Sequence, residues 1–150
     1  MVRQRTNIHS MQNTRIPFLA GRLSDAASRF IEAELREAGY SDLLPSHGDL
    51  LNALMMHKEL SVLELTKLTH RSKSTVSALA DKLVVLGYIE KRRSTEDSRV
   101  MLLTLSDKGR AVEPVMQCIS HKLTQYLTEG LEVNEIEQTE AILERLLRRF

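Results

Sequence analysis

The chain has 150 residues, a length typical of one domain, and a formal net charge of +1. Hydrophobic residues make up 42% of it, charged residues 27% and aromatic residues 4%, which fits a mostly helical protein and excludes a disordered tail, a collagen-like fibre or a disulfide scaffold. One cysteine cannot form an internal disulfide, and no apolar run approaches the roughly 20 residues that span a bilayer. Residues 1–15 lack the apolar stretch of a secretory signal and any periodicity. We therefore expect a cytoplasmic protein without membrane contact, whose first 15 residues form a mobile arm.

Basic residues are concentrated in one part of this nearly neutral chain. Residues 67–99 carry eight basic side chains against four acidic ones, whereas residues 16–66 carry four against eight and residues 129–150 carry three against six. A cationic segment in a chain of little net charge points to contact with a polyanion. A solvated basic surface is the alternative, and charge alone does not decide between the two.

Helical periodicity predicts two helices in the first third of the chain. Apolar residues recur at helical spacing from Ile16 and stop at Gly39. Residues 45–49 then open a second helix, for which Ser46 is the expected cap, answered by Asp49 three residues later. The expected buried face of this helix consists of Leu50, Leu51, Leu54 and Met55.

Two short capped helices follow. Ser61 and Glu64 have the spacing of a capping box, and the helix they begin is expected to bury Val62, Leu65 and Leu68. Ser72 caps the next helix, which ends at Gly87, where a left-handed residue is favoured. Its apolar positions recur every three or four residues, so one face is core and the other is free: Val76, Leu79, Leu83 and Leu86.

The hydrophobic period then changes from helical to alternating. Residues 88–93 and 99–105 predict two strands joined by a polar turn. On the second strand we expect three side chains to face inward, namely Met101, Leu103 and Leu105.

Two further helices are predicted after the strands. Ser106 caps a fifth helix that ends at Gly130, and its Pro114 is expected to kink it near Arg110. Residues 134–137 cap a last helix that carries an apolar stripe to the end of the chain.

Two short helices, a tight turn and a two-stranded ribbon occur in this order in a winged helix-turn-helix. The second helix of such a pair lies in the major groove, with its N-terminal residues against base edges. Here that helix presents a lysine and small hydroxyl side chains, which bond to bases or phosphates at close approach. The predicted DNA contacts in this part of the chain are Ser61, Lys73, Ser74, Thr75 and Ser77. An ordinary polar helix surface is the alternative.

Several short motifs in this region form a specific combination. They follow the capped helix at 61–68 and read Ser74-Thr75-Val76-Ser77, Leu86-Gly87-Tyr88-Ile89-Glu90, and Asp97-Ser98-Arg99 before Leu103-Thr104-Leu105-Ser106-Asp107-Lys108-Gly109. Together they resemble the MarR family of bacterial transcriptional regulators, and the flanking helices match that family in length and order. Thr66, where the family usually has alanine, and Pro114 depart from the family pattern.

The resemblance implies a homodimer whose N- and C-terminal helices interlock, with each subunit offering one winged helix to a palindromic operator. It also implies that Arg99 enters the minor groove at the tip of the wing while Asp97 helps to hold it. A guanidinium in a narrow groove meets an enhanced negative potential, and a carboxylate two residues away can fix its orientation. A plain surface ion pair is the alternative. Phosphate contacts, which supply affinity rather than sequence preference, would then come from the leading strand: Lys91, Arg92 and Arg93.

The resemblance also implies how the domain is organised. A single domain spans 1–150, with dimerisation helices at 1–42 and 107–150 around a winged-helix DNA-binding region at 43–106. A small-molecule pocket is implied between these parts, where His47 and His57 are candidates to contact an aromatic or anionic effector. A histidine that completes a helix cap is the alternative for each.

Other candidate sites are weaker. Cys118 and His121 lie three residues apart on a helix, but two ligands do not make a metal site. Cys118 adjoins the apolar stripe at Ile119, so we expect a buried and unreactive thiol. The sequence shows no phosphate-binding loop, paired carboxylates or Ser/His/Asp set, so we expect no enzyme, no cofactor and no metal.

The sequence thus predicts a mainly α-helical protein with a small β-hairpin wing, in which flanking helices form a dimer. The expected function is a dimeric repressor that a small-molecule effector releases from double-stranded DNA. The alternative is a winged-helix protein-interaction module, in which the basic wing meets an acidic partner. DNA retention that is lost at high salt would favour the first function.

Overall fold

The structure, a computed structural model, describes residues 14–150. Residues 1–13, most of the predicted arm, lie outside the described part. The elements within it are α1 (Ile16–Glu37), α2 (Pro45–His57), β1 (Glu59–Ser61), α3 (Val62–Thr69), α4 (Lys73–Val85), β2 (Ile89–Arg93), β3 (Met101–Leu105), α5 (Asp107–Ala111), α6 (Glu113–Thr128) and α7 (Val133–Leu147). No helix in this stretch has the length and apolar character needed to cross a membrane.

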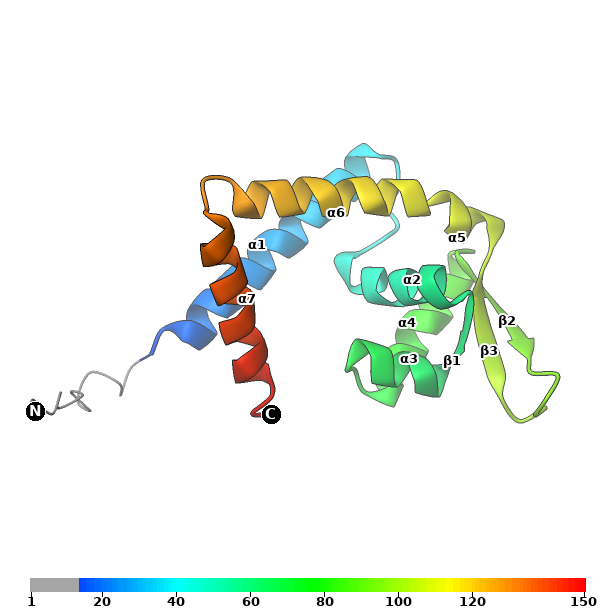
Figure 1. The fold of residues 1–150 in the computed structure, drawn as a ribbon. Helices are drawn as coiled ribbons and strands as arrows, with labels where there is room; N and C mark the ends of the chain where they lie inside the picture. The colour runs from blue at the N-terminus through cyan, green and yellow to red at the C-terminus, as the bar shows by residue number, and fades with distance from the viewer. Residues whose placement is uncertain (1–13) are drawn as a thin grey trace, which may run out of the picture.

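These elements form two parts, shown in Figure 1. Helices α2, α3 and α4 pack beside the small sheet, whereas α1 and α6 cross each other above them and α7 descends from the far end of α6. The crossing is fixed by stacked rings of Phe30 and Tyr126, 5.8 Å between centroids, and by the Lys122–Glu34 ion pair at 2.6 Å. The predicted winged helix-turn-helix with flanking helices is therefore confirmed.

The predicted capping chemistry sets the boundaries of α3 and α4. The Glu64 N–H donates to Ser61 Oγ at 3.2 Å, and the Ser61 N–H donates to Glu64 Oε2 at 2.7 Å. The backbone hydrogen bond from Ser61 lowers the pKa of the Glu64 carboxyl. After α4, Gly87 adopts φ +81°, a left-handed conformation that glycine takes without a steric penalty.

The sheet has three antiparallel strands in the order β1-β3-β2, one more than predicted. β1 pairs Leu60 with Leu103, and the opposite edge of β3 pairs Leu103 with Lys91. Leu103 and Leu105 are buried as expected, but Met101 is 39% exposed, which corrects the expectation that it faces inward. Met101 is the first residue of β3 and pairs with Arg93, the last residue of β2, so it lies next to the turn of the wing.

A glycine makes the junction between the sheet and α5 possible. The Ser106 N–H donates to the Tyr88 carbonyl at 3.0 Å, while Ser106 Oγ donates to the Gly87 carbonyl at 2.6 Å and accepts the Gly109 N–H at 3.0 Å. A Cβ atom at Gly109 would lie 2.1 Å from the Tyr88 carbonyl oxygen. Only glycine allows α5 to lie this close to the backbone of Tyr88, the residue before β2.

Asp42 joins the loop before α2 to this junction. Its carboxylate accepts the Tyr88 hydroxyl at 2.7 Å and Lys108 Nζ at 3.1 Å. Desolvation raises the pKa of Asp42, but the hydrogen bonds from Tyr88 and Lys108 outweigh it, so the pKa lies below its usual value. Burial and the bond to Asp42 raise the pKa of Tyr88 far above its usual range.

The predicted fifth helix is two helices. α5 ends at Ala111, and α6 begins at Glu113 with Pro114 in its first turn. Proline has no N–H to donate and is accepted at the start of a helix, so the chain begins a new helix instead of kinking one. The last helix likewise begins at Val133, and not at the predicted 134–137 cap, because the Glu135 carboxylate accepts the Glu132 N–H at 2.9 Å.

Candidate nucleic-acid interface

The exposed start of α4 carries a cluster of hydroxyl groups. The Thr75 N–H donates to Ser72 Oγ at 3.2 Å, which confirms Ser72 as the cap. Ser72 Oγ also lies 2.9 Å from Ser74 Oγ and 2.8 Å from Thr75 Oγ1. Lys73 is exposed beside this cluster, and Ser77 is half-buried one turn further along. The predicted contact residues of this helix therefore share one end of α4, with one of them partly covered.

The opposite face of α4 fixes this arrangement. Val76, Ala80 and Leu83 are buried in the core, so the helix cannot rotate without exposing them. His70, which ends α3, adopts φ +52° and turns the chain toward α4. The turn and the buried face together hold the hydroxyl cluster toward solvent.

Ser61, also predicted to contact DNA, caps the start of α3. Its Oγ donates to Glu64 Oε2 at 2.7 Å in addition to accepting the Glu64 N–H. A nucleic-acid contact from Ser61 requires it to share this hydroxyl with the cap.

The turn of the wing is held by side chain to backbone hydrogen bonds. Ser94 Oγ accepts the Glu96 N–H at 3.2 Å, and Asp97 Oδ1 accepts the backbone N–H of Arg99 at 2.9 Å. Asp97 therefore supports the backbone that carries Arg99, and in residues 14–150 no ion pair joins its carboxylate to the Arg99 guanidinium. This corrects the expectation that the carboxylate fixes the guanidinium fork. Arg99 remains exposed.

The cations of β2 are already engaged within the chain. Lys91 pairs with Asp81 of α4, and Arg92 pairs with Glu59 of β1. Arg93 donates to the Ser98 carbonyl at 3.3 Å. A phosphate bound by Lys91 or Arg92 must therefore compete with a carboxylate.

The two histidines occupy different places. His47 is 2% exposed, and its Nδ1 accepts the Leu44 N–H at 3.1 Å, so it completes the start of α2 in place of the predicted cap Ser46. Burial lowers the pKa of His47, which favours the neutral imidazole that can accept this hydrogen bond. His57 is exposed at the end of α2 and lines a shallow hollow with Leu68 and Thr69. Leu68 is 47% exposed there, although its spacing predicted burial.

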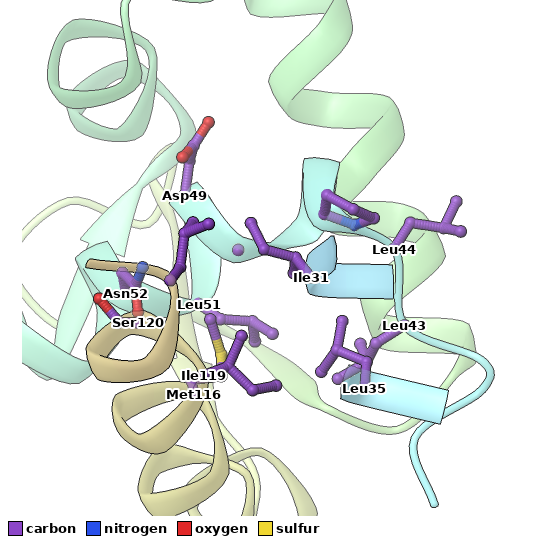
Figure 2. Close-up of a pocket in the computed structure, with 13 residues that line it drawn as sticks. Ile31, Leu35, Leu43, Leu44, Asp49, Leu51, Asn52, Met116, Ile119 and Ser120 are labelled. Atoms are coloured by element: carbon purple, nitrogen blue, oxygen red, sulfur yellow. The ribbon is translucent and has the colours of Figure 1, made fainter. Parts of the chain in front are cut away.

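A cavity of about 160 Å³ lies between α1, α2 and α6. Figure 2 shows apolar side chains around it, with Asp49, Asn52 and Ser120 as its polar groups. His47 does not line this cavity. Its apolar walls come from the following residues: Ile31, Leu35, Leu43, Leu51, Met116, Ile119 and Leu123.

The position of Cys118 differs from the expected one. Its thiol is exposed on α6, whereas the neighbouring Ile119 is buried. Adjacent residues of a helix point about 100° apart, which places Cys118 beyond the apolar stripe. In the part of the chain that the structure describes, no group of three or more His, Cys, Asp or Glu side chains is arranged to hold a metal ion.

Three carboxylates with a place in this region were missed by the sequence analysis. Asp81 and Glu59 hold the basic wing strand, and Asp49 accepts Arg71 Nη2 at 2.7 Å and Nε at 3.2 Å. Each pair joins residues that are ten or more positions apart, so no local pattern marks it. The excess of acidic residues in 16–66 was a signal for Glu59 and Asp49, whereas Asp81 lies inside the basic segment 67–99 and had no such signal.

Comparison with known proteins places these features in a family. The model described as MarR family matches residues 41–100. The transcriptional repressor MprA of Escherichia coli strain K12 is 31% identical over 87 residues, which cover 58% of this chain and 49% of MprA. The HTH-type transcriptional regulator TcaR of Staphylococcus aureus strain Newman is 32% identical over 99 residues, which cover 64% of this chain and 66% of TcaR. The chain thus spans about half the length of MprA.

A solved structure extends the likeness over nearly the whole fold. The S. aureus MepR–DNA complex superimposes with a TM-score of 0.83 at 22% identity, covering 92% of this chain and 100% of that chain. This likeness shows the winged-helix fold with its flanking helices. The matched segment contains α2, β1, α3, α4 and β2, with the capping residues Ser61 and Ser72 and the wing residues Asp97 and Arg99. This chain belongs to the MarR family.

Proposed function

We propose that this protein is a sequence-specific DNA-binding transcriptional regulator that acts as a homodimeric repressor on a palindromic operator. The observation that carries the proposal is the exposed, capped start of α4 beside a basic wing, with both attached to one buried core. A helix with a free N-terminal face of this kind fits the major groove, while a cationic hairpin beside it reaches the adjacent backbone.

The contact residues fall into two classes in this proposal. Lys73, Ser74, Thr75 and Ser77 read base edges from α4, with Ser61 bonding at the start of α3. Arg99 enters the minor groove from the turn that Asp97 supports, and phosphate contacts come from the cations of β2: Lys91, Arg92 and Arg93. The first class decides which sequence is bound, and the second supplies affinity for any sequence.

Exposed apolar surface on the terminal helices supports the dimer. Large apolar side chains on α1 and α7 lie open to solvent, and α7 buries no residue within the described chain. A second copy is the proposed cover, because about 25 cal/mol is gained for each Å² of apolar surface removed from water. Two-fold symmetry then places the two α4 helices in successive major grooves, about 10 base pairs apart.

The cavity between α1, α2 and α6 supports control by a small molecule. It lies where the helices proposed to form the dimer meet the helix that supports α3 and α4. A ligand bound there alters how these parts pack. The free energy by which it favours release from DNA equals the difference between its binding free energies for the free and the DNA-bound protein.

Selection of bound sequences from random DNA tests the proposal. We expect a palindromic site whose affinity falls steeply with salt, because each neutralised phosphate releases a counterion. Equal binding to all sequences would mean that the protein has no preferred operator. Absence of DNA binding at low salt, with capture of an acidic protein instead, would leave the protein-interaction module as the function.

A further inference from the structure

The start of α2 is closed by a buried imidazole. His47 is 2% exposed, and its Nδ1 accepts the backbone N–H of Leu44 at 3.1 Å. His47 stands three residues after Leu44, at the position from which the Glu or Gln of a capping box reaches back to the first residue of the motif. Because Nδ1 accepts a hydrogen bond, the imidazole is neutral and carries its one proton on Nε2.

A proton on Nδ1 is incompatible with this arrangement. The imidazolium form of histidine carries an N–H on both nitrogens and accepts no hydrogen bond. The Nδ1–H of His47 and the N–H of Leu44 would then be two donors that face each other, and a buried donor without a partner is costly. Uptake of a proton by His47 therefore requires the start of α2 to open.

The charged side chains that act on His47 from neighbouring elements are Lys82 on α4 and Asp42 in the loop before α2. Burial lowers the pKa of His47 most, the Lys82 charge lowers it further, and Asp42 opposes both. Asp42 is itself bound by the Tyr88 hydroxyl at 2.7 Å and by Lys108 Nζ at 3.1 Å. Although desolvation opposes them, these hydrogen bonds hold the pKa of Asp42 below its usual value, so its carboxylate remains ionised while His47 titrates.

The helix that His47 closes connects the two parts of the molecule. α2 contacts α1 and α6 as well as α3 and α4, as its place in Figure 1 indicates. Gly48, in the first turn of α2, faces the Met116 side chain of α6, and Leu50 and Leu51 directly after it are buried. Opening of this turn therefore changes how the terminal helices are attached to α3 and α4.

We propose that His47 makes this regulator sensitive to acid: a proton on Nδ1 breaks the hydrogen bond to the Leu44 N–H, opens the start of α2 and weakens operator binding. The effect on DNA rests on the proposed function, whereas the opening of α2 does not. His47 thus has a role other than the effector contact that was expected from the sequence.

The direction of the response follows from the position of His47. Its pKa in the folded chain lies below the ordinary value of 6.5, so the neutral form stabilises the closed start of α2 above pH 6.5. This stabilisation is lost as pH falls from that value through the folded pKa. One proton is taken up on opening, so the equilibrium constant for opening rises by at most about tenfold for each pH unit in this range.

Nuclear magnetic resonance of the whole chain between about pH 8 and pH 5 tests the proposal. The ¹⁵N signals of the His47 ring distinguish a nitrogen that accepts from one that carries a proton, and hydrogen exchange of the Leu44 amide measures opening. We expect Nδ1 to be the accepting nitrogen at neutral pH. The protection factor of Leu44 should then fall, by up to about tenfold for each pH unit, as His47 takes up its proton.

Two substitutions and a matched control locate this response. His47→Gln supplies an amide oxygen that can accept the Leu44 N–H and does not titrate, so protection of Leu44 should persist in acid. His57→Gln, at an exposed histidine of the same helix, should leave the response unchanged. Lys82→Met removes a positive charge that acts on His47 and should move the His47 titration to higher pH, a readout that does not require the His47→Gln variant to fold.

The affinity for the selected operator is measured over the same pH range. We expect a loss of at least about fivefold in acid, and less than about twofold in His47→Gln, because couplings between distant sites are typically of this size. Exposed histidines such as His57 and His70 gain positive charge in acid, which attracts DNA. A loss of affinity therefore has the opposite sign to their effect.

Three results would overturn the role of His47: a ring that stays neutral until the whole fold is lost, protection of Leu44 that does not change as the ring takes up its proton, or a response that survives His47→Gln. An unchanged titration in Lys82→Met would overturn the influence of α4 on this site. Opening in acid without a change in operator affinity would overturn the link to DNA binding. The resonance measurements need no DNA, so absence of DNA binding at every pH would count against the proposed function alone.

Discussion

The winged-helix region and the terminal helices bury their apolar residues to very different extents. Within residues 14–150, 13 of the 16 buried hydrophobic residues lie between Leu43 and Leu105, whereas 12 of the 18 exposed large hydrophobic residues lie in α1 or between Tyr126 and Phe150. The winged-helix region therefore owes its stability to contacts within one chain. The terminal helices leave apolar side chains exposed, which the proposed second copy would cover.

Removal of the last helix is the most severe way to test this difference. Deletion of residues 134–150 should yield aggregate, or a monomer that no longer binds a full palindrome, because it removes the apolar face of α7 from the proposed interface. Sedimentation gives the oligomeric state, and a titration with the selected operator gives the affinity. A stable, soluble monomer that binds the palindrome as tightly as the intact chain would contradict the dimer.

The opposite test destabilises the winged-helix region, whose apolar residues are buried within one chain. Gly109→Ala should lower the free energy of unfolding by about 3 kcal/mol or more, since the new Cβ overlaps the Tyr88 carbonyl. Denaturant unfolding at fixed protein concentration measures this. The control is Gly48→Ala, whose Cβ would meet Met116 Cε at an ordinary 3.6 Å. Equal stability of the two variants would mean that the α5 junction tolerates a side chain.

A smaller effect is expected from a substitution in the wing, where the winged-helix region is proposed to contact DNA. Arg99→Ala should weaken operator binding at least tenfold and leave fold and oligomeric state unchanged, because a well-placed groove contact is worth about 1–3 kcal/mol. Arg36→Ala is the matched control, since its exposed guanidinium pairs with Glu32 on α1, away from the wing. Fluorescence anisotropy with the selected operator gives both affinities. Unchanged affinity in Arg99→Ala would mean that the wing does not contact the operator through Arg99.

Residues on α4 and on β2 should differ in the kind of effect they have. Lys73→Ala and Ser77→Ala should change which sequence is preferred, whereas Lys91→Ala should weaken all sequences alike and reduce the salt dependence. Repeating the selection with each variant distinguishes these outcomes. A change of base preference in Lys91→Ala would mean that β2, and not α4, reads the sequence.

The smallest effect concerns the attachment of the loop before α2. The pKa of Asp42 is lowered in the folded chain, so its carboxylate stabilises the fold above its unfolded pKa, and this contribution is lost as pH falls through the folded pKa. Asp42→Asn should therefore cost less than about 1 kcal/mol at neutral pH, because the group is partly exposed, and nothing in strong acid. Unfolding curves at both pH values measure the difference, with Glu90→Gln as an exposed control. A cost that persists in strong acid would mean that the Asp42 charge is not its cause.

Features that depend on neighbours in the sequence were predicted well. Ser61, Ser72 and Gly87 end or begin helices as expected, because caps and left-handed turns are decided within four residues. The order of the winged-helix elements follows from these boundaries. The recognition face of α4 follows from the spacing of its buried residues.

Features that depend on distant partners were not predicted. β1 has three residues, too few to show a period, and exists because β3 offers an edge more than 40 residues later. Leu68 and Met101 fit the apolar pattern but lie where the small core ends. His47 fills the role assigned to Ser46, since the imidazole reaches the Leu44 N–H.

The ion pairs of Lys91 and Arg92 bear on how such a regulator searches a chromosome. Each of these cations is matched by a carboxylate, so DNA of arbitrary sequence gains less from this surface than the number of basic residues implies. A chromosome offers about a million or more competing sites, and weak adhesion to them leaves more protein free to reach its operator. In the proposed function, Asp81 and Glu59 thereby limit the affinity of this surface for DNA of any sequence and leave more of the discrimination to α4.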